Sequence, residues 1–454
     1  MNNISTYYAQ HIAEKIQRFQ VILAEAGFDE VIIASGDTRL QFQDDLAYPF
    51  KANPYFREWA PLNRRAGCYL HIHRNSSKPS LYLLNTEDIW HTARQCLPPG
   101  YDHALTIIEY QTLDEVKENL GLAAGKASQT MALVSEENVF ACADHCWNPP
   151  ALLHRIDYQR CRKTLYEQHC VRQANRLAVP AHRAAQQAFM AGHGEREICA
   201  AYYAASHSCE SDMPYSVIVG INEHAAVLHH NNLDKHRPET PRSLLLDAGI
   251  DFQGYASDIT RTYAFDPSSE FAEMINCLDE KQQALAAAGG IGKTPVELHT
   301  LAQRNIAELL LAFGLITGSV DAALETGLVD TFFPHGLGHH LGCSVHDKGG
   351  QIANAQGDCL PPNQQYPKLR TLAPMVANQV YTVEPGVYFI PSKLADCRKG
   401  GSASLVNWPR VEAFIKYGGI RIEDNLMLHS DGQLENMTRD AFAADMSPKV
   451  PAHA

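Results

Sequence analysis

The stretch SLLLDAGIDFQGYASDITRTYAF, residues 243–265, contains two strand-like runs that each carry an aspartate. The runs SLLLDAGI and YASDITRTYAF are joined by DFQG, which predicts a β-hairpin. If Phe252 and Gln253 are the central residues of the turn, Asp247 lies directly opposite Asp258. Like charges placed in this way destabilise a sheet unless a cation or a shared proton lies between them. A shifted register, or an aspartate in contact with solvent, is the alternative interpretation.

Two later strand-like runs, QVYTVEPGVYF (379–389) and GGIRIEDNLML (418–428), each place a glutamate in an apolar setting. Glu384 has apolar neighbours, and Glu423 shares a strand face with Arg421. An ordinary ion pair on a solvated face would explain Arg421 with Glu423, but it explains Glu384 less well. Together with the hairpin aspartates, these glutamates predict four carboxylates on core-like strands.

Between these two pairs of carboxylates lies FFPHGLGHHLGCSVHDKGG, residues 332–350, which we name the histidine loop. Its five glycines weaken any helix and allow the backbone to approach a bound group closely. Four carboxylates with one imidazole form an oxygen-rich site, of the kind that holds two divalent ions and favours manganese. Without metal the carboxylates would repel one another, so we expect bound metal to stabilise the fold. The residues alone leave open which of the four histidines is used.

The order of predicted elements divides the chain into two domains and a tail. Residues 1–155 are expected to form a mixed α/β domain, with an amphipathic helix followed by strands such as DEVIIASG and CYLHIHR. Residues 156–440 show helices followed by a strand pair, twice over, which indicates an α+β domain of two similar halves. Pro180 is expected to kink or split one of its helices. Residues 441–454 are expected to form a flexible tail.

The composition excludes several classes of partner. A formal net charge of −13 argues against binding to nucleic acid or to an anionic membrane, since both require basic patches. The chain has no run of about 18 apolar residues, and its first twenty residues lack the apolar core of a signal peptide. The twelve cysteines are scattered, as is typical of reduced, buried thiols. We therefore expect a cytoplasmic protein.

Four segments resemble, in order and spacing, the motifs of the pita-bread (creatinase/aminopeptidase-like) metallopeptidases: LLLDAGIDFQGYASDITRTY, PHGLGHHLGCSVHD, YTVEPGVYF and GGIRIEDN. QFQDDLAYPFKANPYF and PYSVIVGINEHAAVLH are similar to the bacterial prolidases, or Xaa-Pro dipeptidases, a subgroup that includes the organophosphorus acid anhydrolases. The likeness spans roughly residues 8–437. It implies an N-terminal mixed α/β domain and an α+β catalytic domain with a curved antiparallel sheet and flanking helices.

The resemblance also implies a role for each candidate residue. Two manganese ions per subunit, or other divalent ions, are expected to be held by Asp247, Asp258, His339, Glu384 and Glu423. Substrate contacts are expected from Arg370, His229, His346, Tyr215 and Asp45. Arg421 and His335 are expected to support the ligands. Asp45 would act in a homodimer, where an N-terminal loop reaches the partner's active site. The chain departs from the family pattern at His230, Cys343 and Ser344, which affects the expected pocket wall.

The implied reaction is hydrolysis of a dipeptide with proline second, by a hydroxide generated at the two metals. Glu384 would shuttle the proton, His346 would donate to the oxyanion and His229 would line the pocket. Arg370 would clamp the substrate's carboxylate. Organophosphorus esters could be hydrolysed as a side activity. The alternatives are an aminopeptidase P-type enzyme that acts on longer Xaa-Pro peptides, and a non-catalytic pita-bread protein used for binding.

Overall fold

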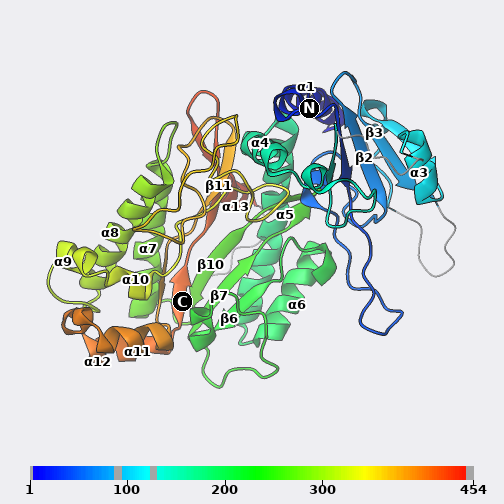
Figure 1. The fold of residues 1–454 in the computed structure, drawn as a ribbon. Helices are drawn as coiled ribbons and strands as arrows, with labels where there is room; N and C mark the ends of the chain where they lie inside the picture. The colour runs from blue at the N-terminus through cyan, green and yellow to red at the C-terminus, as the bar shows by residue number, and fades with distance from the viewer. Residues whose placement is uncertain (1–3, 86–94, 123–129, 446–454) are drawn as a thin grey trace. The chain divides into compact units, whose positions relative to one another are not determined.

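A computed structural model describes residues 4–85, 95–122 and 130–445, and the chain forms two compact units (Figure 1). The first unit comprises residues 1–170 with the short segments 252–255 and 352–360, and the second comprises residues 171–251, 256–351 and 361–454. Within the described ranges, no helix combines the length and the apolar character that a bilayer-spanning segment requires.

The first unit contains a five-stranded mixed sheet with the strand order β4-β3-β2-β1-β5. Its strands are β1 (Glu30–Ala34), β2 (Cys68–His73), β3 (Ser80–Leu84), β4 (Thr106–Tyr110) and β5 (Met131–Val134). The helices are α1 (Ile4–Ala26), α2 (Pro54–Arg57), α3 (Leu113–Asn119) and α4 (Pro150–Arg160). The amphipathic helix expected near the N-terminus is α1, which buries one apolar stripe, from Tyr8 to Leu23. This unit is therefore mixed α/β, as predicted.

A small exposed hairpin lies between β1 and α2, and we name it the 39–48 hairpin. Leu40 pairs with Ala47, and the backbone N–H of Tyr48 donates to the carbonyl of Arg39 at 2.8 Å. The hairpin carries four exposed apolar side chains, of which Phe42 is 89% accessible; the set is Leu40, Phe42, Leu46 and Tyr48. Exposed apolar side chains that lie together often mark contact surfaces.

The second unit contains antiparallel sheets flanked by helices (Figure 1). Their strand orders are β10-β7-β6, β11-β14-β15 and β12-β13, and the short pair β8-β9 lies at the tip of the β7-β10 hairpin, where residues 252–255 belong to the first unit. The strands are β6 (Ile218–Ile221), β7 (Ser243–Ala248), β8 (Asp251–Phe252), β9 (Tyr255–Ala256), β10 (Ile259–Ala264), β11 (Gln379–Val383), β12 (Gly386–Tyr388), β13 (Gly419–Arg421), β14 (Asp424–Leu428) and β15 (Leu434–Asn436).

The helices of this part of the chain follow the predicted order, with helices before each group of strands. They are α5 (Leu165–Met190), α6 (Glu195–Ser206), α7 (Glu270–Ala287), α8 (Pro295–Ala312), α9 (Val320–Glu325), α10 (Val329–Phe332), α11 (Pro391–Lys399), α12 (Trp408–Ile415) and α13 (Met437–Ala444). Pro180 does not split α5, and its neighbours Val179 and Ala181 are fully buried, so packing offsets the lost hydrogen bond. Helix α13 includes the first four residues of the expected tail; residues 446–454 lie outside the described residues.

The hairpin formed by β7 and β10 has a different register from the one predicted. Asp247 pairs with Thr260, not with Asp258, which lies just before β10. The prediction was wrong because it placed the turn one residue too early. Gln253 and Gly254 both have positive φ, 55° and 90°, so they form the centre of the turn, as in the type I′ turns that suit right-twisted hairpins.

The two halves of the second unit meet at an isolated bridge between Thr260 and Glu423. One apolar core lies between α5, α6 and the β6-β7-β10 sheet, and another lies between α7, α8 and the strands β11 and β14. The strands thus form a curved antiparallel layer covered by helices, as expected for the pita-bread fold. The bridge brings polar side chains from both halves to one place.

Candidate active site

The second unit contains a cavity of about 510 Å³ that is lined by most of the predicted site residues. Those in its wall are His229, Asp247, Asp258, His335, His339, His346, Arg370, Glu384, Arg421 and Glu423. Of the predicted set, only Tyr215 and Asp45 are absent from this wall. Residues far apart in the sequence are thus gathered around one hollow.

We name the four carboxylates of the cavity the cavity carboxylates. Three of them lie just outside a strand, and one lies within a strand. Asp247 is in β7, and Asp258 lies one residue before β10. Glu384 follows the last residue of β11, and Glu423 lies between β13 and β14. A carboxylate at a strand end is released from the alternation of the pleat, so it can turn toward a common centre.

The histidine loop runs beside β11 and is held there by backbone hydrogen bonds. The N–H of Thr382 donates to the carbonyl of His339 at 2.9 Å, and the N–H of Glu384 donates to the carbonyl of Leu337 at 2.8 Å. Gly338 permits this approach, because a Cβ there would lie 2.0 Å from the carbonyl oxygen of Thr382. The glycines of the loop therefore place His339 next to Glu384.

His339 presents one ring nitrogen to the cavity carboxylates. Its Nδ1 lies 3.0 Å from the backbone carbonyl of His340, and a carbonyl only accepts, so Nδ1 carries a proton. Its Nε2 lies 3.4 Å from Asp258 Oδ2 and 3.7 Å from Glu384 Oε1. In a neutral ring Nε2 carries a lone pair, and this lone pair would face negative oxygens. The arrangement therefore requires either a second proton on the ring or a cation between Nε2 and the carboxylates.

Tyr215 joins the two aspartates, although it does not line the cavity. Its hydroxyl lies 2.8 Å from Asp247 Oδ1 and 2.6 Å from Asp258 Oδ1. The hydroxyl has only one proton, so it cannot donate a hydrogen bond to both carboxylates at once if both are ionised. The two aspartates converge as the sequence suggested, but they do so through this contact and not as cross-strand partners.

Arg421 is buried and organises the side of the cavity behind Asp247. Its guanidinium donates to Asp247 Oδ2 at 2.6 Å, to Thr260 Oγ1 at 3.1 Å and to the hydroxyl of Tyr388 at 3.0 Å. His335 Nδ1 donates to the next residue's backbone carbonyl at 2.8 Å, so its Nε2 accepts from Tyr388 at 2.9 Å. This chain of hydrogen bonds fixes the orientation of Asp247 and of His335.

The electrostatics of the cavity are unbalanced without a cation. Burial, reinforced by the charges of Asp258 and Asp247, raises the pKa of Glu384 to about 7. Burial and the same neighbours raise the pKa of Glu423 well above its usual range. The ligand atoms of Asp258, His339 and Glu423 lie within 4.8 Å of one another. Buried carboxylates that share one imidazole in this way fit divalent cations, which would relieve their repulsion.

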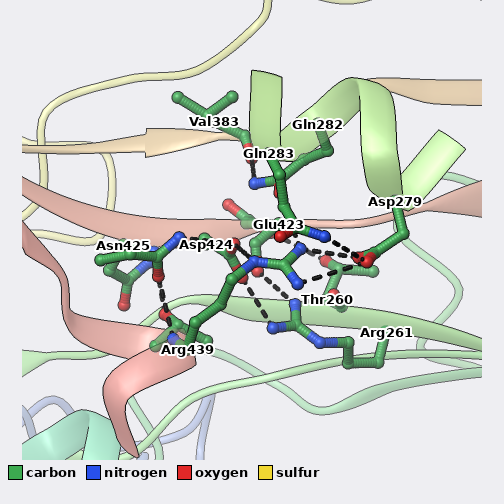
Figure 2. Close-up of polar contacts among 12 residues, drawn as sticks. Thr260, Arg261, Asp279, Gln282, Gln283, Val383, Glu423, Asp424, Asn425 and Arg439 are labelled. Atoms are coloured by element: carbon green, nitrogen blue, oxygen red, sulfur yellow. Dashed lines mark hydrogen bonds and ion pairs between the residues drawn. The ribbon is translucent and has the colours of Figure 1, made fainter. Parts of the chain in front are cut away.

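A network of charged side chains lies behind Glu423 and holds its strand in place (Figure 2). Asp424 is fully buried and accepts from Arg261 and Arg439, each at 2.6 Å. Arg261 also donates to the backbone carbonyl of Glu423 at 2.7 Å, and Arg439 continues to Asp279 of α7 at 2.6 Å. The network ties β10, β14, α7 and α13 together, so Glu423 projects from a rigid frame.

The remaining predicted residues provide an accessible side of the cavity. His229, His346 and Arg370 are all exposed. Although His346 reaches solvent, the protein atoms around its ring partly desolvate it, and this desolvation, together with the charges of His339 and Arg370, lowers the pKa of His346 to about 4. Asp45 lies in the first unit, on the 39–48 hairpin, and it is exposed. Of the departures from the family pattern, His230, Cys343 and Ser344 are all described by the structure and are absent from the cavity wall.

Sequence reasoning missed several residues that support the site. Thr260 donates from Oγ1 to Glu423 Oε2 at 2.8 Å, and Asn425 accepts from the backbone N–H of Asp258 at 3.0 Å. Each lies two residues from a candidate ligand in the sequence, and period-two alternation could have indicated both. Tyr388 and the cavity-lining Lys368 carried no comparable sequence signal.

Comparisons with known proteins identify the family of the chain. Residues 169–430 match the model of metallopeptidase family M24, and residues 6–158 match that of the Xaa-Pro dipeptidase N-terminal domain. The chain is 39% identical to an Xaa-Pro dipeptidase of Pseudoalteromonas haloplanktis and 40% identical to one of Shewanella loihica, over 97% of this chain and 99% of each relative.

Among solved structures, aminopeptidase P of Escherichia coli in complex with substrate superposes with a TM-score of 0.70. The match covers 95% of both chains at 20% identity, so it supports the fold alone. The family models and the full-length relatives are more specific. The chain belongs to metallopeptidase family M24, in its Xaa-Pro dipeptidase group.

Proposed function

We propose that this protein is an Xaa-Pro dipeptidase that hydrolyses dipeptides with a C-terminal proline. The observation that carries the proposal is the cavity itself, where His339 Nε2 and four carboxylates face one another within a chain that matches Xaa-Pro dipeptidases over its whole length. All five candidate ligand positions are filled in this chain, and its full-length relatives are named Xaa-Pro dipeptidases; both observations argue against a non-catalytic protein with this fold.

Two divalent cations would be held by the cavity carboxylates and His339. Four oxygen-donor side chains with a single imidazole suit manganese better than the nitrogen- or sulfur-rich sets that zinc prefers. When bound, the ions would polarise the scissile carbonyl and acidify the attacking water. The Arg421 contact to Asp247 and the Thr260 contact to Glu423 would keep both carboxylates in ligand orientation.

The side chains around the cavity would divide the remaining tasks. A carboxylate oxygen of Glu384 would take the proton from the attacking water and pass it to the leaving proline nitrogen. An imidazole N–H of His346 would donate to the oxygen of the developing oxyanion. His229 would contact the substrate from another segment of the cavity wall. Each of these groups lines the same hollow, so no large rearrangement is needed.

Arg370 would set the length of the substrate. Its exposed guanidinium lines the cavity and matches the fork geometry that binds a carboxylate through two hydrogen bonds. A dipeptide ends in a carboxylate at the proline, whereas a longer Xaa-Pro peptide presents an amide there. We therefore expect the enzyme to prefer Leu-Pro to Leu-Pro-Gly. The aminopeptidase P-type alternative predicts the reverse.

The test measures proline release from Leu-Pro, and leucine release from Leu-Pro-Gly, by metal-depleted protein reconstituted with manganese, zinc or cobalt. Manganese-dependent cleavage of Leu-Pro with little action on the tripeptide supports the proposal. Faster cleavage of the tripeptide would favour the aminopeptidase. Arg370→Met should chiefly raise KM for Leu-Pro, and unchanged KM with a lower kcat would contradict the clamp. Organophosphorus triester hydrolysis is expected only as a slow side reaction in the same cavity.

A homodimer would complete the assembly, with Asp45 contacting the active site of the second copy. The exposed apolar side chains of the 39–48 hairpin support this part of the proposal, because dimerisation would remove them from water. Sedimentation of the wild type and of Phe42→Ser tests it, and a monomeric wild type would contradict it. We also propose the cytoplasm as the compartment, since twelve scattered cysteines suit a reducing environment.

A further inference from the structure

A second cluster of potential ligands lies in the same unit and does not line the cavity. We name Glu195, His224 and His230 the Glu195 cluster; their ligand atoms lie within 4.8 Å of one another. His224 Nδ1 lies 2.7 Å from Glu195 Oε1, and His230 Nε2 lies 2.9 Å from Glu195 Oε2. The two imidazole rings are 4.5 Å apart between centroids. Both histidines therefore converge on one carboxylate, one on each oxygen.

The backbone holds this carboxylate in place independently of the histidines. Glu195 is 2% exposed, and it accepts from the N–H of Ile221 at 3.0 Å and from the N–H of Asp234 at 2.7 Å. Burial alone would raise the pKa of Glu195, but these N–H groups and the two imidazoles outweigh it, so the pKa is lowered. The carboxylate of Glu195 is thus ionised and held in one orientation. Each of its oxygens accepts one hydrogen bond from a backbone N–H and one from an imidazole N–H.

We propose that the Glu195 cluster is a third metal site, which binds a divalent transition-metal ion of the zinc class. Two imidazoles with one carboxylate form a set of protein ligands that zinc uses with a water in the fourth position. Replacing the two imidazole protons by one ion preserves both backbone hydrogen bonds to the carboxylate. The donor set is richer in nitrogen than the cavity carboxylates, so it should select zinc over manganese.

The geometry allows this with small movements. Ligand atoms about 2.0–2.2 Å from a tetrahedral ion lie roughly 3.3 Å from one another, so each imidazole would retreat from Glu195 by about half an ångström. His224 lies on a short helical turn, Asn222–Ala226, and its side chain is 43% exposed. This exposure gives the ion an entry path and leaves room for a water ligand. His230 is nearly buried, which limits competing partners.

The site would act on the wall of the cavity through the chain. His230 directly follows His229, which lines the cavity, and Leu228 lines it as well. An ion bound by Glu195, His224 and His230 would close the segment from 224 to 230 into a loop fixed at both ends. We therefore expect the bound ion to stabilise this part of the cavity wall without contacting the substrate.

The test compares metal content and zinc affinity in matched variants of the full-length, manganese-loaded protein. The double variant His224→Gln/His230→Gln keeps amide N–H groups that can donate to Glu195, so it retains the hydrogen bonds while losing the ligands. His236→Gln removes an exposed histidine that lies six residues after His230 and outside the cluster, and it serves as the control. Bound zinc is counted by elemental analysis after desalting, and affinity is measured by calorimetric titration.

The wild type and His236→Gln should each bind one zinc ion more than the double variant. This difference of one does not depend on how many ions the cavity holds, so it stays informative if the proposed function fails. His224→Gln alone should weaken this zinc site at least about tenfold. Equal zinc content in wild type and double variant, with equal affinity in His224→Gln, would show a hydrogen-bonded network only and overturn the proposal.

Discussion

The cavity carboxylates and the Glu195 cluster both place imidazoles against carboxylates, but their hydrogen bonding differs. In the Glu195 cluster, each carboxylate oxygen accepts from a backbone N–H and from an imidazole. In the cavity, Glu384 and Glu423 gather with few donors, and burial raises the pKa of both. The first arrangement stabilises the fold while the Glu195 carboxylate is ionised. The second stores electrostatic repulsion that a bound cation would release.

The largest contrast is expected in catalysis. His339→Ala removes a candidate ligand of the cavity, and we expect kcat/KM for Leu-Pro to fall at least about 1,000-fold, because a bound cation contributes several kcal/mol to the transition state. His224→Ala lies in the other cluster and should retain activity within a few-fold of wild type. Comparable losses in the two variants would remove the distinction between the clusters.

Metal removal should reveal the stored repulsion as a loss of stability. A chelated sample should unfold at a temperature several degrees lower than the manganese-loaded one, since ligand at about 1,000 times its Kd contributes about 4 kcal/mol. Differential scanning calorimetry of both samples measures the shift. An unchanged melting temperature in protein shown to be metal-free would mean that the carboxylates do not repel one another.

Single amide substitutions should have opposite effects on the stability of the metal-free protein. Glu423→Gln removes a buried ionisable carboxyl from a repulsive group and keeps an acceptor for Thr260, so it should stabilise the metal-free fold while abolishing activity. Glu195→Gln turns an amide toward a backbone N–H, and we expect a loss of about 1–3 kcal/mol. Denaturant titration of both metal-free variants measures the change in the free energy of unfolding. A change of the same sign in both variants would contradict the comparison.

The smallest expected effect is on the pH dependence of stability, and it concerns a buried histidine that is hydrogen-bonded to a backbone carbonyl and not to a carboxylate. Burial lowers the pKa of His182 to about 3, and its Nε2 donates to the carbonyl of Ala248 at 3.0 Å. The unfolded chain takes up the proton first, so stability is full above a pH of about 6.5 and falls as the pH drops below it. Between pH 8 and pH 6 the loss is about 1 kcal/mol. In His182→Gln, which can keep the hydrogen bond, this part of the pH dependence should disappear from unfolding curves.

Much of the fold could be predicted because periodicity and element order are local properties of the sequence. The apolar runs around Asp247 and Glu384 form strands, and the helices precede them as expected. The register of the first hairpin could not be predicted from the residue pattern, because Gln253 adopts a positive φ that glycine or asparagine adopts more readily. A one-residue error in the turn moved every predicted cross-strand partner.

The convergence of the candidate site depended on contacts that no local pattern encodes. The family resemblance, and not the residues alone, selected His339 among the four histidines of its loop, and the structure places its Nε2 toward Asp258 and Glu384. The supporting role of Tyr388 arises from the pairing of distant strands, so it became visible only in three dimensions, whereas the two-residue spacing of Thr260 from Asp258 could have indicated Thr260.

The bridge between Thr260 and Glu423 has a consequence for how the protein matures in the cell. Because Glu423 is supplied near the end of the chain, a nascent polypeptide on the ribosome holds Asp247 and Asp258 long before their last companion is synthesised. A site that uses all four carboxylates can therefore be complete only after the segment that carries Glu423 has been synthesised and has paired with the segment that carries Thr260.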